Sequence, residues 1–400
     1  MHRILLISDG HGEDWVAAQI AHHLQRLSHA PIELLALPMV GEGHTFERLG
    51  IPIALKTRVL PSGGFTFKSS RHLWLDLRAG LTSYGSHLVH SVRSMASWAD
   101  LVIAVGDILP LGLAWMTGSP YLFVGCTKSD YYTPPGRSCY FLWERVLMMP
   151  PRCLHTFTRD GITCRNLRRH RVPASYWGNP MMDGLDTTES QVPNEGTFIG
   201  LLPGSRSEEA QRNLVDMLAC LPTIHAQSSD PIHFEAAIST GLGLQSFHQA
   251  AQGAGWQSLS DHLLVQDGTL VHLRTGNFNA VLLQADALLA MAGTATEQAV
   301  GLGKPVVTIP GRGPQFTQRF AQLQCQLLGE SVILIEGELA ERPQAVTNAL
   351  WSVLGNSDQL REIRRNGHER MGVPGAAHQI ADYILEQLPQ PVRGGPRSRS

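Results

Sequence analysis

Short apolar runs in this chain alternate with segments in which apolar residues recur every three or four positions. The first run, residues 4–7, precedes a segment whose apolar side chains share one helical face, at Val16, Ile20, Leu24 and Leu27. Further runs that we expect to be strands lie at 32–37, 101–105, 121–124, 198–202, 232–238, 263–265, 270–273, 288–291 and 306–309. This alternation predicts βα units, parallel sheets and the α/β class.

The length of 400 residues exceeds what one hydrophobic core usually serves, so we expect two domains. Both halves repeat the strand, loop and helix pattern, which predicts two doubly wound, Rossmann-like domains at 1–180 and 195–372. A turn at 177–183 and the polar stretch after it are typical of an interdomain linker. A last helix is expected at 375–388, and the Pro/Gly/Ser/Arg-rich tail 389–400 is expected to be disordered.

The composition is that of an ordinary globular protein, with 43% apolar residues, 16% charged residues and a net charge of −2. This balance gives no electrostatic reason to expect a nucleic-acid partner. The six cysteines form no C-x-x-C pair, so we expect reduced thiols in a cytoplasmic protein. The first apolar run is too short for a signal peptide, and no segment approaches the ~20 apolar residues of a membrane span.

A Gly/Ser-rich loop at 61–71 carries two phenylalanines and two cations ahead of a long amphipathic helix. Apolar tips beside cations are typical of a segment that rests on a membrane surface or holds an acyl chain. More often such residues dock a loop onto the protein, and we favour that interpretation. A peripheral position at the cytoplasmic face of the membrane stays open.

A glycine-containing loop, SDGHGED, follows the first strand and leads into a helix. Gly10 and Gly12 allow the backbone to approach a ligand, and Glu13 adds a carboxylate, so all three are candidate substrate-binding residues. His11 is a candidate base, or simply a loop histidine. The dinucleotide fingerprint G-x-G-x-x-G fails, because Trp15 stands at its third glycine position.

Asp107 stands just beyond the end of the expected strand 101–105. The carboxyl ends of parallel strands form the ligand-binding edge of such a sheet, so Asp107 is a candidate general base. The alternative is that Asp107 caps the helix expected at 108–116. The polar, aromatic loop at 125–133 follows the next strand, where it suits recognition of an acceptor.

A second glycine turn, at Gly293, connects a buried strand to a helix. Such a turn places a helix N-terminus at the sheet edge, where anionic ligands bind. Thr294 and Glu297 have the spacing of a capping box, in which each side chain satisfies a backbone donor. The alternative is that Glu297 presents its two oxygens to the hydroxyls of a ribose. The candidate substrate-binding residues here are Gly293, Thr294, Thr296 and Glu297.

Arg206 lies in the turn between the strand 198–202 and a helix expected at 210–221. There a guanidinium and a helix N-terminus can share a diphosphate, which arginine grips through two hydrogen bonds. A solvated arginine is the alternative. Ser205 and Glu208 also have the spacing of a capping box.

Four motifs carry a resemblance to a known family, namely YWGNPMMDGL (176–185), LLPGSRSEEAQ (201–211), ADALLAMAGTATEQ (285–298) and GKPVV (303–307). They resemble the lipid-A-disaccharide synthase-related family, in its cyanobacterial-type branch, strongly across 175–335 and more thinly in the first half. The resemblance implies the GT-B glycosyltransferase architecture, with an acceptor-side domain, then a nucleotide-sugar-binding domain facing it across a cleft. It also implies that the last helix crosses back to the first domain.

The activity implied is inverting transfer of an (acylated) glucosamine from a UDP-sugar to a lipid-linked or sugar-phosphate acceptor. The family's catalytic aspartate falls on Asp107, with His11 as a second choice for the base. Its PGSR arginine falls on Arg206, and Glu297 matches the ribose-binding glutamate of related GT-B enzymes. Helix N-termini at Arg206 and Thr294 would hold the diphosphate and stabilise the leaving group.

Gln315 and Gln318 resemble the donor-sugar glutamines of the muramyl-peptide N-acetylglucosaminyltransferase. No Asp-x-Asp motif of the metal-dependent transferases occurs, so the resemblance implies neither a metal nor a cofactor. The family's WAW signature is absent, and CTKSDYYTP stands in its place, which leaves the acceptor open. The oligomeric state stays open too.

Three other functions compete with this one. A UDP-N-acetylglucosamine 2-epimerase shares the fold and the glutamate-bearing nucleotide loop. A protein that binds the nucleotide sugar without chemistry would keep the same loop. An NAD-dependent oxidoreductase is the most distant of the three, because of the tryptophan in the first glycine loop.

Overall fold

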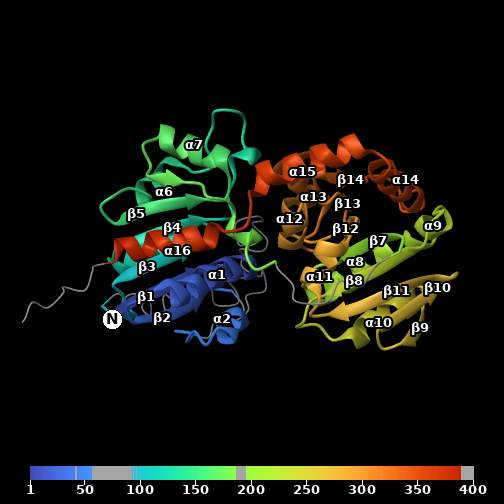
Figure 1. Ribbon diagram of the computed structural model, residues 1–400, viewed down its shortest axis with the longest axis horizontal. Coiled ribbons are helices and arrows are strands. Elements are labelled where there is room, and N and C mark those ends of the chain that lie inside the picture. Colours follow the sequence, from blue (N-terminus) through green and yellow to red (C-terminus); the bar gives the residue numbers. More distant parts are fainter. Residues whose placement is uncertain (41–42, 56–91, 93, 96, 186–194, 389–400) are drawn as a thin grey trace, which may run out of the picture. The chain divides into compact units, whose positions relative to one another are not determined.

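The structure is a computed structural model that describes residues 1–40, 43–55, 92, 94–95, 97–185 and 195–388. The chain divides into two compact units (Figure 1). Unit 1 comprises Met1–Asp183 and Pro374–Ser400, and unit 2 comprises Gly184–Val373.

Unit 1 is built on a parallel sheet of six strands in the order β2-β1-β3-β4-β5-β6. The strands are β1 (His2–Ser8), β2 (Ile32–Pro38), β3 (Leu101–Val105), β4 (Tyr121–Gly125), β5 (Cys153–Thr158) and β6 (Ala174–Ser175). From β1 the chain adds β2 on one side and β3 to β6 on the other. The strand order therefore reverses between β1 and β3, and ligands of open α/β sheets bind at such a reversal.

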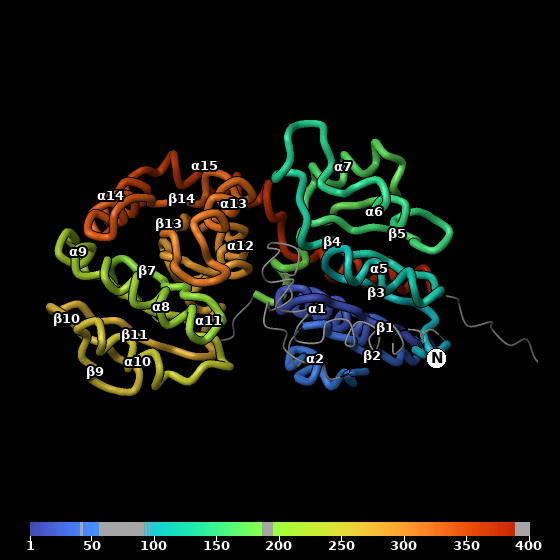
Figure 2. The backbone as a smooth tube through the Cα atoms, turned by 180° about the vertical axis from the view of Figure 1, so that it is seen from behind, coloured from blue at the N-terminus to red at the C-terminus, as the bar shows by residue number. Residues whose placement is uncertain are grey.

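Helices cover both faces of this sheet. Those described are α1 (His11–Leu27), α2 (His44–Arg48), α5 (Ile108–Thr117), α6 (Leu142–Leu147), α7 (Gly161–Arg169) and α16 (Ala376–Gln387), with the 3-10 turns η2 (Asp130–Tyr132) and η3 (Pro180–Met182). Ile4 and Leu6 point to the face covered by α1 and α16, whereas Leu5 and Ile7 point to the face covered by α5. Figure 2 shows α5 over β3 from behind.

The last helix, α16, packs beside α1 (Figure 1). Its buried apolar side chains include Ile380 and Ile384. Asp183 holds its first turn, because the carboxylate accepts hydrogen bonds from the backbone N–H of Gly375 and, at 2.7 Å, of Ala377.

Unit 2 has an eight-stranded sheet in the order β14-β13-β12-β7-β8-β11-β10-β9. Its strands are β7 (Thr197–Leu202), β8 (Ile232–Ile238), β9 (Gln257–Ser260), β10 (Leu263–Gln266), β11 (Thr269–Thr275), β12 (Ala287–Ala290), β13 (Val306–Thr308) and β14 (Val332–Leu334). Strand order reverses between β7 and β12, which pair in parallel. This reversal is the ligand-binding position expected of unit 2.

The helices of unit 2 flank its sheet on both faces. They are α8 (Ser207–Leu218), α9 (Leu221–Ala226), α10 (Leu244–Gly253), α11 (Phe278–Gln284), α12 (Thr294–Gly301), α13 (Gln318–Leu328), α14 (Arg342–Leu354) and α15 (Ser357–Met371), with the 3-10 turn η4 (Gly329–Ser331). The helix α11 packs so closely on β7 that a Cβ at Gly200 would lie 2.8 Å from Val281 Cγ1.

Every expected strand coincides with an observed one, but two details differ. The run 263–265 belongs to no βα unit, because β10 pairs antiparallel with both β9 and β11. The helix expected at 210–221 begins earlier, at Ser207, and α9 follows it as a separate helix. The loop at 61–71 and the tail at 389–400 lie outside the described residues.

Two further expectations can be compared with the described residues. All six cysteines are free thiols, and most are buried. Among the described helices, none combines the length and the apolar character needed to cross a bilayer.

Candidate functional sites at the two strand reversals

In unit 2, the loops that follow β7 and β12 run side by side. The backbone N–H of Met291 donates to Leu202 O at 2.9 Å, which continues the pairing of the two strands beyond their ends. Gly204 has a φ of +103°, a conformation that side chains rarely adopt, and a Cβ there would lie 3.3 Å from Met291 O. The two turns therefore begin at one edge of the sheet.

Two buried amide side chains fix these turns. Asn213 Nδ2 donates to Pro203 O at 2.9 Å and to Met291 O at 3.3 Å, so this side chain ties one turn to the other. Gln324 Nε2 donates to the carbonyls of Ala292 and Gly293, at 2.8 and 3.2 Å. Sequence spacing predicts neither contact, although both amides lie on the apolar side of a helix.

The helix α12 begins at Thr294, and Gly293 is its N-cap residue without a side-chain capping hydrogen bond. The predicted Thr294–Glu297 capping box is therefore wrong, because Thr294 stands one position inside the helix. Thr296 is fully buried and donates to Ala292 O at 2.7 Å. Glu297 is partly exposed in the first turn of the helix.

Arg206 occupies the N-cap position of α8, again without a side-chain capping hydrogen bond. The predicted Ser205–Glu208 capping box is wrong as well, since α8 starts at Ser207. Burial lowers the pKa of the Arg206 guanidinium, and the nearby Glu209 carboxylate raises it in part. Two helix N-termini without side-chain caps thus lie at adjacent strand ends, and one of them carries a half-buried cation.

Glu209 organises the loop that follows β13. Its carboxylate Oε1 accepts hydrogen bonds from the backbone N–H of Gln315, at 3.1 Å, and of Phe316, at 2.7 Å. A Cβ at Gly313 would lie 2.0 Å from the same oxygen, so only glycine fits there. Gln315 is therefore held beside the start of α8, whereas Gln318 donates to Glu336 Oε1 at 3.0 Å on an exposed surface.

In unit 1, the ends of β1 and β3 are also adjacent, with Ser8 paired to Val105. Asp107 caps α5, because its Oδ1 accepts from the Leu109 N–H at 2.8 Å. The capping alternative for this residue is thus confirmed. The backbone N–H of Asp107 donates to Asp9 Oδ2 at 3.3 Å, which brings two carboxyl groups together. The sequence prediction missed Asp9.

The expected loop at 8–14 is shorter than predicted, because α1 begins at His11. His11, which is exposed, and Gly12 therefore lie in the first helical turn. A Cβ at Gly10 would lie 2.2 Å from Glu13 Oε2, and Glu13 Oε1 accepts from Thr127 Oγ1 at 3.0 Å. The segments after β1 and β4 are linked in this way.

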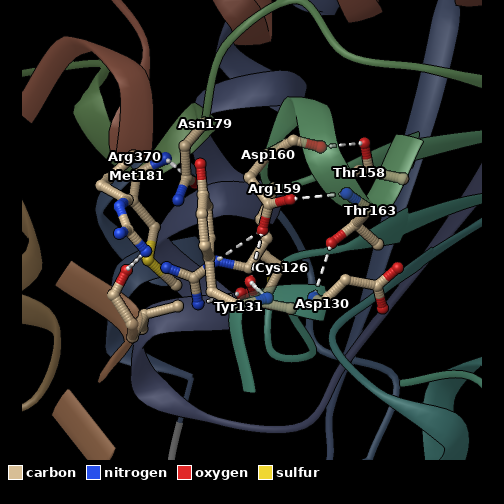
Figure 3. A network of polar contacts seen from close by, with 12 residues as sticks. Cys126, Asp130, Tyr131, Thr158, Arg159, Asp160, Thr163, Asn179, Met181 and Arg370 are labelled. Carbon is tan, nitrogen blue, oxygen red and sulfur yellow. Dashed lines mark hydrogen bonds and ion pairs between the residues drawn. The ribbon is translucent and has the colours of Figure 1, made fainter. Parts of the chain in front are cut away.

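A buried polar network supports the loop at 125–133 (Figure 3). Asp160 accepts from Ser129 Oγ at 2.6 Å and from the Thr163 N–H at 2.8 Å. Asp130 accepts from Asn166 Nδ2 at 2.7 Å, and its own N–H donates to Thr163 Oγ1 at 2.9 Å. The polar residues of this loop that face inward are thus used to build it.

Comparison with known sequences finds several relatives that share one name. The chain is 26% identical to the lipid-A-disaccharide synthase of Syntrophus aciditrophicus over an alignment of 240 residues, which covers 54% of this chain and 58% of that protein. The counterpart from Solibacter usitatus is 26% identical over an alignment of 243 residues, which covers 55% of this chain and 59% of that protein. The chain is similar to lipid-A-disaccharide synthases. This confirms the predicted resemblance, although the match spans less than two thirds of those relatives' length. No family model matches the chain.

Solved structures agree on the GT-B fold. The co-structure of MnaA from S. aureus with UDP superposes with a TM-score of 0.61 and 14% identity, covering 96% of both chains. The glycosyltransferase of kitacinnamycin gives a TM-score of 0.60 and 14% identity, covering 97% of this chain and 99% of the other. The Neisseria meningitidis UDP-GlcNAc 2-epimerase bound to UDP-GlcNAc gives a TM-score of 0.56 and 13% identity, covering 96% of this chain and 100% of the other. These likenesses support the predicted fold of two Rossmann-like domains.

Proposed function

We propose that this chain is an inverting glycosyltransferase of the lipid-A-disaccharide synthase type. The observation that carries the proposal is the pair of helix N-termini at the reversal between β7 and β12, with Arg206 at the start of α8. Such N-termini attract anions, and a guanidinium adds the charge and the two-pronged geometry that a diphosphate needs. Two solved structures of similar fold hold UDP or UDP-GlcNAc, which supports a UDP-sugar as the ligand of this site.

Unit 2 binds the donor in this proposal. The diphosphate lies against the N-termini of α8 and α12, Glu297 accepts hydrogen bonds from the ribose hydroxyls, and Gln315 contacts the sugar. As the bond between the anomeric carbon and the diphosphate breaks, negative charge grows on the leaving UDP. Fixed N–H dipoles and Arg206 stabilise that charge.

Unit 1 supplies the base. Asp107 takes the proton from the attacking hydroxyl of the acceptor as that oxygen bonds to the anomeric carbon. Its capping role leaves this possible, because only Oδ1 is engaged by the Leu109 N–H. The acceptor in this proposal is a lipid-linked or sugar-phosphate molecule, as the resemblance to lipid-A-disaccharide synthases implies.

A lipid-linked acceptor requires contact with a membrane surface, and α6 of unit 1 supports that role. Four neighbouring apolar side chains are exposed by more than half, at Phe141, Leu142, Trp143 and Val146. Lys128 lies 5.7 Å from the Phe141 ring, and its ammonium is paired with the buried Glu144 carboxylate. The double change Leu142→Ser and Trp143→Ser should reduce co-sedimentation with anionic vesicles. Leu259→Ser, an equally exposed change in unit 2, is the matched control.

The decisive experiment measures UDP release from UDP-N-acetylglucosamine and from its acylated glucosamine analogue, with and without a glucosamine-phosphate lipid. Acceptor-dependent release of UDP supports the transferase. Conversion of the nucleotide sugar without any acceptor supports the epimerase, whose fold is also similar. Binding of UDP without turnover in either assay supports a non-catalytic binding protein. Arg206→Ala should weaken UDP binding, whereas Arg212→Ala, farther along α8, should not.

A further inference from the structure

Asp9 is a partly buried residue whose carboxyl group has no role in the mechanism above. It follows β1 at the strand reversal of unit 1, next to the residue proposed as the base. Its Oδ2 receives the long hydrogen bond from the Asp107 N–H. Its Oδ1 is buried and has no hydrogen-bond partner among the described residues. A buried carboxylate oxygen without a donor is costly, whereas a protonated carboxyl group can itself donate.

The backbone is shaped to bring this group close to Asp107. Gly106 has a φ of +133°, and a Cβ there would lie 1.8 Å from Asp9 Oδ1. Any other residue at position 106 would push the Asp9 carboxyl out of its place. Because Gly106 immediately precedes Asp107, the same glycine sets the position of both carboxyl groups.

The charged groups around Asp9 are acidic. Burial raises the pKa of Asp9 well above its usual value, and the charges of Asp107 and Glu13 raise it further. Two adjacent carboxyl groups resist simultaneous ionisation, so the pair holds one proton over a wide pH range.

We propose that Asp9 is a positioning residue that keeps this proton and donates it in a hydrogen bond to the ionised Asp107. The inference rests on the proposed function, in which Asp107 is the base. The acceptor's proton goes to Asp107, the acceptor oxygen bonds to the anomeric carbon, and UDP leaves with the electron pair. Asp9 stays protonated throughout, so the step adds one proton to the pair and solvent removes it afterwards.

The pH profile of kcat tests this assignment. The pair is active with one proton, so kcat should fall at high pH as Asp9 loses that proton. In Asp9→Asn the amide can still donate a hydrogen bond to Asp107, so kcat should drop only a few-fold. The amide cannot ionise, so the fall of kcat attributed to Asp9 at high pH should disappear. Asp9→Ala should lose at least tenfold in kcat, with UDP binding unchanged. Asp14→Asn, a change of another buried carboxyl on the same segment, should keep the falling limb.

Two results of these kinetic measurements would overturn the proposal. One is an Asp9→Asn variant that is as inactive as Asp9→Ala, which would mean that a hydrogen-bond donor at this position does not sustain kcat. The other is a falling limb that Asp9→Asn leaves unchanged.

A measurement that needs no activity separates this inference from the proposed function. Carboxyl ¹³C NMR follows the titration of Asp9 in the wild-type protein and in Asp107→Asn. The pKa of Asp9 should be lower in the variant, because the neighbouring charge is gone. An unchanged pKa would refute the pair, whatever reaction the protein catalyses. A lowered pKa in a protein without transferase activity would keep the pair and reject the proposed function.

Discussion

The carboxylate of Glu209 accepts a hydrogen bond from the backbone N–H of Phe316 at 2.7 Å, and so fastens the loop after β13 to the first turn of α8. The side chain is almost fully buried, and Gly313 gives it room. In this way a residue that contacts no ligand in the proposed mechanism sets the position of Gln315 relative to Arg206.

Glu209→Ala should therefore loosen the loop and leave two backbone donors unsatisfied. Each unsatisfied buried donor costs about 1–3 kcal/mol, so we expect a melting temperature lower by several degrees and weaker UDP binding. Differential scanning calorimetry and titration calorimetry measure the two effects. Glu208→Ala is the control, because Glu208 is exposed and its ion pair with Arg212 is long, at 3.9 Å. Equal behaviour of the two variants would contradict the anchoring role.

Glu297→Gln should raise the Kd for UDP about tenfold, which corresponds to ~1.4 kcal/mol. A charged acceptor of ribose hydroxyls binds more strongly than a neutral amide. The melting temperature without ligand should hardly change, because Glu297 takes part in no capping box. Glu330→Gln, an exposed change in the same unit, is the control. A lower melting temperature with unchanged UDP affinity would point to a structural role instead.

Asp14 should make the stability of unit 1 depend on pH. Burial raises its pKa from 3.8 to about 7, against the effect of the hydrogen bond from Ser8 Oγ. The folded state therefore holds this proton more tightly than the unfolded state. The stabilisation is complete below pH ~4 and is lost as the pH rises toward ~7, by a few kcal/mol in total.

Asp14→Asn carries no charge at any pH and should not show this loss. The unfolding free energy of the variant minus that of the wild-type protein should be larger at pH 8 than at pH 4. Urea unfolding at a series of pH values measures this difference. A stability difference that does not vary with pH would show that Asp14 ionises normally. Asp9 is present in both proteins, so its own titration largely cancels from the comparison.

Gly106→Ala should lower both the melting temperature and kcat, because its Cβ would overlap Asp9 Oδ1 and its φ would be strained. The same change in an Asp9→Ala background should cost less stability, since the overlap is gone and only the strain remains. Gly112→Ala is the control, because α5 leaves open space around that position. An equal cost in both backgrounds would show that Asp9 is not held against Gly106.

The sequence predicted the strands that are continuous apolar runs, but it missed β5, β6, β9 and β14, which are short or carry polar residues. It predicted the helix starts less well. Capping-box spacing at Thr294 and Ser205 matched the motif, but each helix began at another position. Asn213 and Gln324 were missed, since their partners are carbonyls of distant turns. The sequence did carry a signal for Asp9. Like Asp107, it is an aspartate next to a glycine just after the end of a strand.

The docking of α16 on α1 has a consequence for the order in which the protein matures on the ribosome. All of unit 2 is synthesised before the segment that completes unit 1. Until Ile380 and Ile384 emerge, part of the apolar surface of α1 stays uncovered. The Asp183 carboxylate also lacks the backbone N–H donor that Ala377 supplies in the finished fold. Unit 1 is therefore begun first and completed last. Until α16 has been synthesised, the uncovered apolar surface of unit 1 is the surface that a chaperone would recognise.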